Sequence, residues 1–145
     1  MGYTVYWSPK KLTKEQVPEQ FWKDSIKALD GVLSSGVRIG DWVGKNERKS
    51  GSEIVNATTL TDEPHPSIVF NGIEELREDY ESFVLCFDGS WNFCKTARMP
   101  YDLAVKCVLI LADKHGLLDE WSFDGDCEEE EYVKAHDLLF KLQLI

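Results

Sequence analysis

Residues 81–102 read ESFVLCFDGSWNFCKTARMPYD, and this stretch decides how the centre of the chain folds. Apolar residues recur at every second position in Phe83–Phe87 and Trp91–Arg98, as is typical of β-strands. The segment Asp88-Gly89-Ser90 between them predicts a three-residue hairpin loop. That loop gathers the aromatic side chains on one face, whereas a two-residue loop would scatter them over both. We therefore predict an antiparallel hairpin with one aromatic face.

Lys95 lies on the aromatic face of this predicted hairpin. The register places Glu81 diagonally across the strands, within reach of a long side chain. A lysine partly withdrawn from water must be paired or lose its charge, so we predict an ion pair between Lys95 and Glu81. In the alternative interpretation, Lys95 and Arg98 face a bound anion or substrate.

A helix is predicted directly after the hairpin. Pro100 suits its first turn, Asp102 suits the positive end of its dipole, and a buried apolar stripe continues toward Gly116. A helix N-terminus beside basic residues favours anion binding, but Asp102 already supplies a negative charge there. The candidate ligand-binding site or structural junction consists of Glu81, Lys95, Thr96, Arg98, Tyr101 and Asp102.

Strands and helices are also predicted on both sides of the hairpin. A capping box formed by Thr13 and Gln16 predicts the start of a long helix that ends before Gly36. Further strands are predicted at Tyr3–Trp7, Ile54–Leu60, Ser67–Phe70 and around Glu120–Phe123, and a last helix carries the apolar face Tyr132, Ala135, Leu139 and Leu142. The order predicts a single compact α+β domain over residues 1–145. We expect one mainly antiparallel sheet of about five strands, with about three helices packed chiefly on one face.

Composition and charge narrow the classes of function. The 145 residues carry a net charge of −10, which repels phosphate backbones, so we expect no direct binding to nucleic acid. A weaker alternative is a basic contact loop formed by Lys45, Arg48 and Lys49. The longest apolar run and the opening residues predict neither a membrane span nor export, and hence a cytoplasmic protein. The four cysteines lack metal-site spacing and are expected to be free thiols, most of them buried.

The tail of the chain is strongly acidic. Two aspartates flank Gly125, but the ligand pattern of a calcium loop is absent, so we predict a turn and the acidic first turn of a helix, with no metal and no cofactor. The candidate acidic surface for a partner consists of Asp124, Asp126, Glu128, Glu129, Glu130 and Glu131.

Several segments of the sequence match motifs that one group of proteins shares. They are YTVYWSP at 3–9, FNG at 70–72, FCKTAR at 93–98 with PYDLAV at 100–105, and SFDGD at 122–126. The chain resembles a small family of uncharacterised proteins of bacteriophages and large DNA viruses. It departs from the family's usual FCKTARKPYD and SSDG at Met99 and Phe123. The resemblance implies a viral context and no particular chemistry. It marks as shared positions Asn71, Glu81, Lys95, Thr96, Arg98, Tyr101, Asp102 and Asp124.

Two hypotheses for function follow. The first is a non-enzymatic interaction protein, a viral accessory factor or virion component, whose acidic surface binds a basic protein partner. The second is an enzyme or small-ligand binder, for an anion or nucleotide, with a site formed by Lys95, Arg98, Tyr101 and Asp102. There lysine and arginine would hold the anion and Asp102 or Glu81 would act as base. Oligomeric state is open in both.

Overall fold

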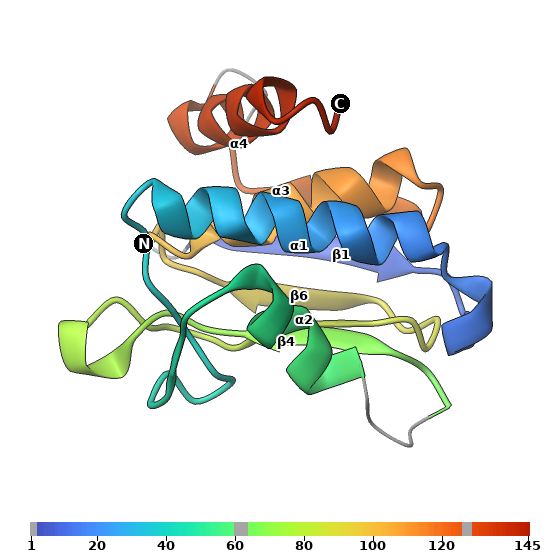
Figure 1. Ribbon diagram of the computed structural model, residues 1–145, viewed down its shortest axis with the longest axis horizontal. Helices are drawn as coiled ribbons and strands as arrows, with labels where there is room; N and C mark the ends of the chain where they lie inside the picture. The colour runs from blue at the N-terminus through green and yellow to red at the C-terminus, as the bar shows by residue number, and fades with distance from the viewer. Residues whose placement is uncertain (1–2, 60–63, 126–128) are drawn as a thin grey trace.

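The computed structural model describes residues 3–59, 64–125 and 129–145 and has an α+β architecture (Figure 1). The strands are β1 Thr4–Pro9, β2 Ile39–Gly40, β3 Glu47–Arg48, β4 Ser67–Phe70, β5 Phe83–Cys86, β6 Asn92–Lys95 and β7 Leu118–Phe123. The helices are α1 Glu19–Ser34, α2 Gly51–Thr59, α3 Asp102–Lys114 and α4 Glu130–Lys141, with short 3₁₀ helices η1 Lys14–Gln16 and η2 Glu74–Leu76. The predicted fold class is confirmed, and none of the described helices has both the length and the apolar character that a membrane crossing requires.

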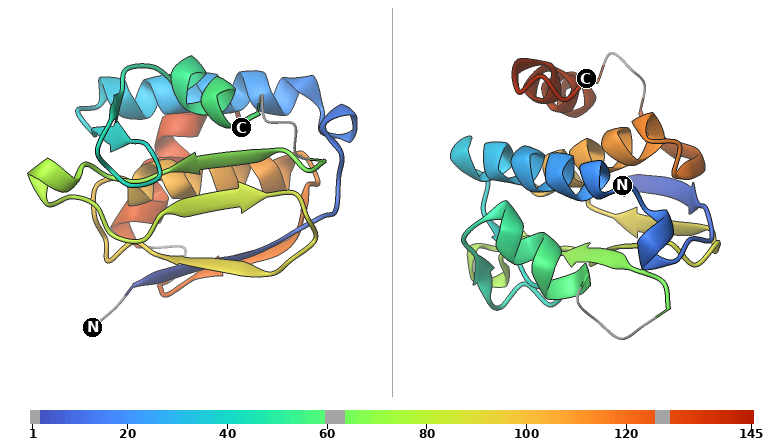
Figure 2. Two further views of the ribbon diagram at one scale, coloured as in Figure 1. Left: turned by 90° about the horizontal axis from the view of Figure 1, so that it is seen from below. Right: turned by 45° about the vertical axis from the view of Figure 1, so that its right-hand side comes forward.

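The strands of the described residues form three small antiparallel sheets in place of the single sheet of about five strands that we predicted. The largest has three strands in the order β6-β1-β7, and β4 pairs with β5. Only β2 and β3 form the third sheet. In Figure 2 (left) β4, β5, β6 and β1 lie in front, and the helices lie behind them or to one side.

The ladder predicted between β5 and β6 is absent: the described strands pair as β6 with β1 and β5 with β4. Thr4 of β1 pairs with Lys95, and Phe70 of β4 pairs with Phe83. At the end of β5 the N–H of Phe87 bonds to Pro66 and its C=O accepts from Leu12, each at 3.0–3.1 Å. β5 and β6 still lie beside each other, since the N–H of Glu81 donates to the C=O of Lys95 at 3.1 Å, but they do not form the predicted ladder.

The first long helix begins later than its capping box indicates. The capping box of Thr13 and Gln16 is present, but it caps η1, and α1 begins at Glu19 after Pro18. The buried face of α1 includes Phe21 and Leu29. A proline at the N-cap separates the two helices, since it has no N–H to donate.

Residues 51–59 form helix α2, so the strand predicted at Ile54–Leu60 is wrong over its described part, and Leu60 lies outside the described residues. The N–H of Glu53 bonds to the Ser50 hydroxyl at 3.1 Å, a helix-capping contact that overrides the β-branched residues. Gly51 sits so close to α1 that a Cβ there would lie 2.2 Å from the carbonyl oxygen of Ile26. Only glycine permits this packing of α2 on α1.

Helix α3 is the centre of the core. It packs on α1 and α4, and most of its residues are buried. Cys107 on α3 and Cys94 on β6 are buried free thiols, as predicted, and burial raises the pKa of each to about 12. Among these apolar residues α3 also buries two charged ones, Asp102 and Lys106.

Candidate functional site

The loop that joins β6 to α3 is held in a tight turn. Met99 donates its N–H to the C=O of Thr96 at 2.9 Å, and the two residues between them, Ala97 and Arg98, have φ values of 51° and 58°. Left-handed conformations at two successive residues other than glycine are costly. The N–H groups of Thr96 and Ala97 donate to the C=O of Tyr3, which fixes the turn to the start of β1.

Lys106 is fully buried beneath this turn. Its ammonium donates to the Tyr3 hydroxyl at 2.5 Å and to Asp102 Oδ2 at 2.7 Å, and it lies 4.8 Å from the ring centroid of Phe123. The other carboxylate oxygen of Asp102 accepts from the Thr96 hydroxyl at 2.6 Å. A buried charge is tolerated only when it is paired and hydrogen-bonded, and both partners of this ion pair meet that condition.

Two acids near the start of α4 complete the surroundings of Lys106. Glu129 accepts from the Tyr3 hydroxyl at 2.9 Å and lies 3.7 Å from the Lys106 ammonium. Arg98 pairs with Glu129 and, at 3.3 Å, with Glu131, and its guanidinium covers the Tyr3 ring at 4.3 Å. We call this group the Lys106 cluster; it consists of Tyr3, Thr96, Arg98, Asp102, Lys106, Glu129 and Glu131.

The pKa shifts in the Lys106 cluster indicate a structural role. Burial, followed by the hydrogen bond with Glu131, raises the pKa of Glu129. Burial, followed by the charge of Asp102, raises the pKa of Tyr3 far above its ordinary value, so its hydroxyl stays protonated and donates. With each group bound to another, the cluster ties β1, the turn and α4 together and presents no free nucleophile.

Residues that we predicted to form two separate sites, the junction and the acidic tail, thus lie together in the structure. Thr96, Arg98 and Asp102 of the junction meet Glu129 and Glu131 of the acidic tail. The tail acids therefore do not form one free surface: Glu129 and Glu131 turn inward.

The remaining predicted residues lie elsewhere. Asp124 accepts from the N–H of Thr4 and from the Tyr6 hydroxyl, each at 3.1 Å. Glu130 pairs with Lys134 on the surface of α4. Asp126 and Glu128 lie outside the described residues.

The predicted ion pair between Lys95 and Glu81 is wrong. Glu81 Oε1 accepts from the backbone N–H of Lys95 at 2.7 Å, while the Lys95 side chain is exposed and has no ion pair within the described ranges. Tyr101 is fully buried, and its hydroxyl donates to the C=O of Glu81 at 2.6 Å. Lys95 thus faces solvent and Tyr101 faces the core.

Neither Tyr3 nor Lys106 was predicted from the sequence as a site residue. A signal for Lys106 was present: it stands four residues after Asp102 in a helix that is otherwise almost entirely apolar. A helix that is hydrophobic all round is buried, so its only internal pair of opposite charges should be buried as well.

A second feature is the tip of the molecule, which we define as residues 41–46 and 71–82. Asn71 joins these two loops: its side-chain amide donates to the C=O of Tyr80 at 3.0 Å and of Trp42 at 3.4 Å, and its Oδ1 accepts from the N–H groups of Gly72 and Tyr80. A Cβ on Gly72 would lie 2.0 Å from the C=O of Glu78, so the backbones are in direct contact. The tip is a rigid pair of loops.

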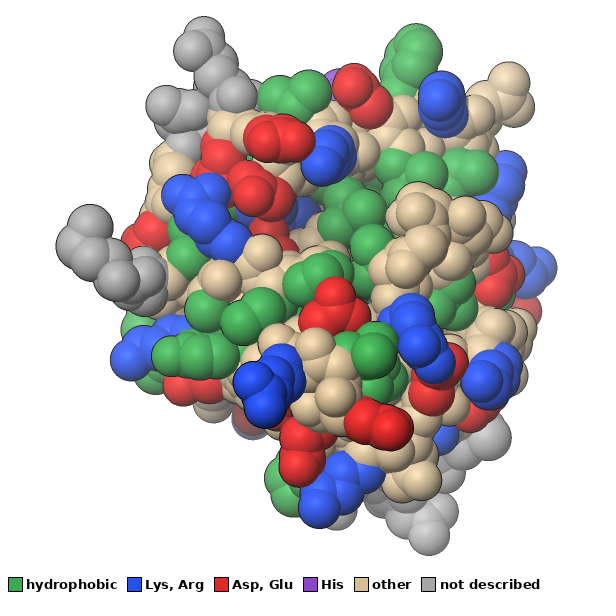
Figure 3. All heavy atoms as spheres, turned by 90° about the vertical axis from the view of Figure 1, so that its left-hand side faces the viewer, with side chains coloured by type: hydrophobic (Ala, Val, Ile, Leu, Met, Phe, Trp, Pro, Cys, Tyr) green, Lys and Arg blue, Asp and Glu red, His purple; other side chains and the backbone are tan. Residues whose placement is uncertain are grey.

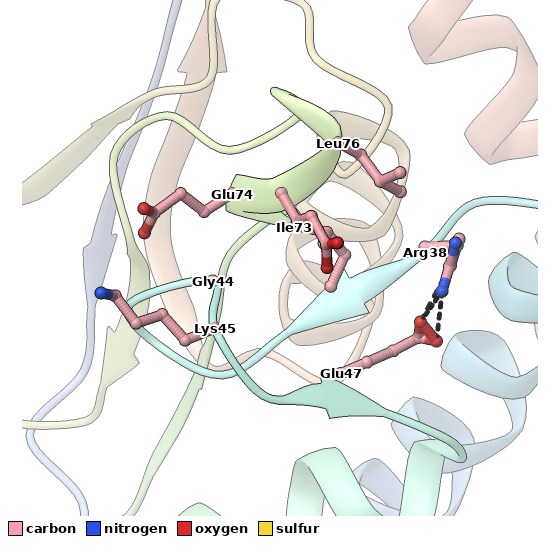
Figure 4. A pocket seen from close by; sticks show the side chains of 8 residues that line it. Arg38, Gly44, Lys45, Glu47, Ile73, Glu74 and Leu76 are labelled. Carbon is pink, nitrogen blue, oxygen red and sulfur yellow. Dashed lines mark hydrogen bonds and ion pairs between the residues drawn. The ribbon is translucent and has the colours of Figure 1, made fainter.

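An open pocket of about 590 Å³ lies beside the tip (Figure 4). Glu74 and Lys45 lie on one side of it, and the ion pair between Arg38 and Glu47 lies on the other, with Ile73 between them. Three acids and two bases line this pocket, so it does not favour an anion. The face of the molecule shown in Figure 3 carries charges of both signs among apolar side chains.

Asp41 caps the first loop of the tip. Its carboxylate accepts from the side-chain amide of Asn46 at 2.8 Å and from the N–H groups of Lys45 and Asn46 at 3.0 and 3.3 Å. Burial acts to raise the pKa of Asp41, but the hydrogen bonds outweigh it, and the pKa lies below its ordinary value. The loop is thus built around an ionised carboxylate.

Acid should therefore loosen this loop. Because the folded-state pKa is depressed, the stability that Asp41 contributes is complete above the unfolded-state pKa of about 3.9 and is lost as the pH falls through the folded-state value. We expect the ¹⁹F NMR signal of fluorotryptophan at Trp42 to move toward that of exposed tryptophan below about pH 4. Asp41→Asn should abolish this titration, and an unchanged titration in that variant would contradict the assignment.

No group of three or more histidine, cysteine, aspartate or glutamate side chains within the described ranges is placed to hold a metal ion. Comparison of the chain with protein-family models, curated proteins and solved structures finds no match.

Proposed function

We propose that the protein is a non-enzymatic interaction protein that binds a basic protein partner through the tip. The observation that carries this proposal is the exposure of two large aromatic side chains on rigid loops. Trp42 is 61% exposed and Tyr80 is 50% exposed, although Asn71 holds the backbone of both residues in place. Trp and Tyr on a pre-organised surface are the residues that most often dominate binding energy at interfaces.

Charge indicates the partner's chemistry. The tip contains six acidic residues and two basic ones, Lys45 and Arg77. Such a surface attracts a positively charged protein and accelerates its association. The resemblance to viral proteins supports an accessory role in an infected cell, where the partner would be a host or viral protein.

The alternative of a small-ligand site or enzyme at Lys95, Arg98, Tyr101 and Asp102 receives less support. Tyr101 and Asp102 are fully buried and already hydrogen-bonded, and Arg98 is paired with two glutamates. A ligand there would have to displace these partners.

Site-specific photocrosslinking tests the proposal. A photoreactive phenylalanine analogue is placed at position 42 and, as the matched control, at Phe140, which is 68% exposed on α4. We expect one basic protein to be captured at position 42 in cell lysate and not at position 140. The captured protein is then purified, and its affinity should fall about thirtyfold or more with Trp42→Ala, and should not change with Phe140→Ala.

Two results would overturn the proposal. One is equal capture at both positions. The other is full affinity of the purified partner for the Trp42→Ala variant.

A further inference from the structure

We infer that the outer face of the sheet β6-β1-β7 carries a pocket for a single arginine side chain of a partner protein. The strands present this face in Figure 2 (left). An uncovered sheet face normally carries polar side chains, because water contacts it. Here Tyr6 of β1 stacks on Trp91, which precedes β6, and Trp91 contacts Phe93, with ring centroids 6.1 and 5.5 Å apart. Trp91 is 56% exposed. The face therefore offers aromatic rings to a ligand.

A small pocket lies among these rings. It has a volume of about 90 Å³, and its walls include Tyr6, Trp91, Glu120 and Ser122. The register places Ser122 beside Tyr6 and Glu120 beside Ser8 on the same face, so the carboxylate and the hydroxyl stand next to the aromatic rings. Water occupies about 30 Å³ per molecule in the liquid, so the pocket has room for roughly three such groups. A guanidinium group fits this size.

The charges around the pocket favour a cation. Within the described ranges Glu120 forms no ion pair, and its carboxylate is exposed. Asp124 lies nearby, accepting from the Tyr6 hydroxyl. These acids would repel a phosphate or a carboxylate. A free carboxylate beside an indole ring is complementary to a positively charged group.

Planarity selects arginine over lysine. A guanidinium stacks flat on the face of an indole and directs parallel N–H groups at a carboxylate, which a lysine ammonium cannot do. In this pocket the guanidinium lies against Trp91 and donates to Glu120, and the Ser122 hydroxyl accepts a further hydrogen bond. The pocket and the tip lie toward opposite ends of β5, since residue 82 precedes that strand and Trp91 follows it. The two proposals can therefore fail independently.

NMR titration with small probes tests this pocket. The indole N–H signal of Trp91 is assigned by its loss in Trp91→Phe. Nα-acetyl-arginine amide should shift that signal with a saturable, millimolar response, and the neutral citrulline analogue should not. Nα-acetyl-lysine amide should bind more weakly than the arginine compound. Equal shifts from citrulline, or equal affinity for lysine, would overturn the assignment.

A pair of isoelectric variants separates local contact from overall charge. Glu120→Gln should weaken binding of the arginine compound by about three- to fivefold, the magnitude of an exposed ion pair or cation–π contact. Asp119→Asn removes the same charge from the neighbouring exposed residue of β7 and should leave the affinity unchanged. If Asp119→Asn weakens binding as much as Glu120→Gln, the effect is one of net charge and the pocket is not an arginine site.

Discussion

Replacing Lys106 with methionine is expected to lower the free energy of unfolding by about 3–5 kcal/mol, the usual effect of removing one partner from a buried ion pair. Methionine fills much of the same volume, so the loss comes from Asp102, which remains buried and keeps only the Thr96 hydroxyl among its side-chain partners. Urea unfolding followed by circular dichroism measures the change.

The matched control is Lys134→Met on α4. Lys134 also pairs with a glutamate one turn earlier, at 3.0 Å, but both side chains are mostly exposed, so its replacement should change stability little. Replacing Asp102 with leucine in the Lys106→Met background should recover at least half of the loss, because no unpaired charge then remains in that pair. Unfolding of Lys106→Met at the wild-type urea concentration would refute a stabilising role for the Lys106 cluster.

The second large effect is expected at Asn71. Asn71→Ala should lower the free energy of unfolding by about 2–3 kcal/mol, because it removes the acceptor for the N–H groups of Gly72 and Tyr80 and the donor to the tip carbonyls. Hydrogen exchange should increase most in residues 41–46 and 71–82, where these bonds are lost.

Asn56→Ala on the exposed side of α2 serves as its control and should have little effect. If hydrogen exchange in the tip is the same in both variants, Asn71 does not hold the two loops together.

The fold class and several elements could be predicted because they depend on local patterns. The alternation in Ser67–Phe70 and the apolar run of α3 led directly to β4 and to a buried helix. Helix α2 could not be read in this way, because the β-branched Ile54 and Val55 favour a strand. The contacts that decide its structure are the Ser50 cap and the close approach of Gly51 to Ile26.

The candidate site was predicted only in part, because strand pairing is a long-range property. A well-formed loop at Asp88–Ser90 indicated a hairpin, but β6 forms its ladder with β1 and β5 forms its ladder with β4. Glu81 therefore bonds to the backbone of Lys95 and not to its side-chain ammonium. We predicted that the acidic tail faces a partner. The sequence does not show that Glu129 turns inward to pair with Arg98 and with the buried Lys106.

The central position of β1 sets the order in which the molecule can assemble during synthesis. Thr4 pairs with Lys95 of β6, and Val5 pairs with Phe123 of β7. Each edge of β1 can therefore pair only after the matching strand has been made. Contacts between residues so far apart in sequence make folding slow, because the entropy of closing a long loop is lost before the contacts form. On the ribosome, β4 and β5 can pair as soon as they emerge, while the aromatic strand Thr4–Pro9 stays unpaired until β6 has been made and keeps one free edge until β7 has been made. Chaperones that shield exposed β-strands would act on this segment first.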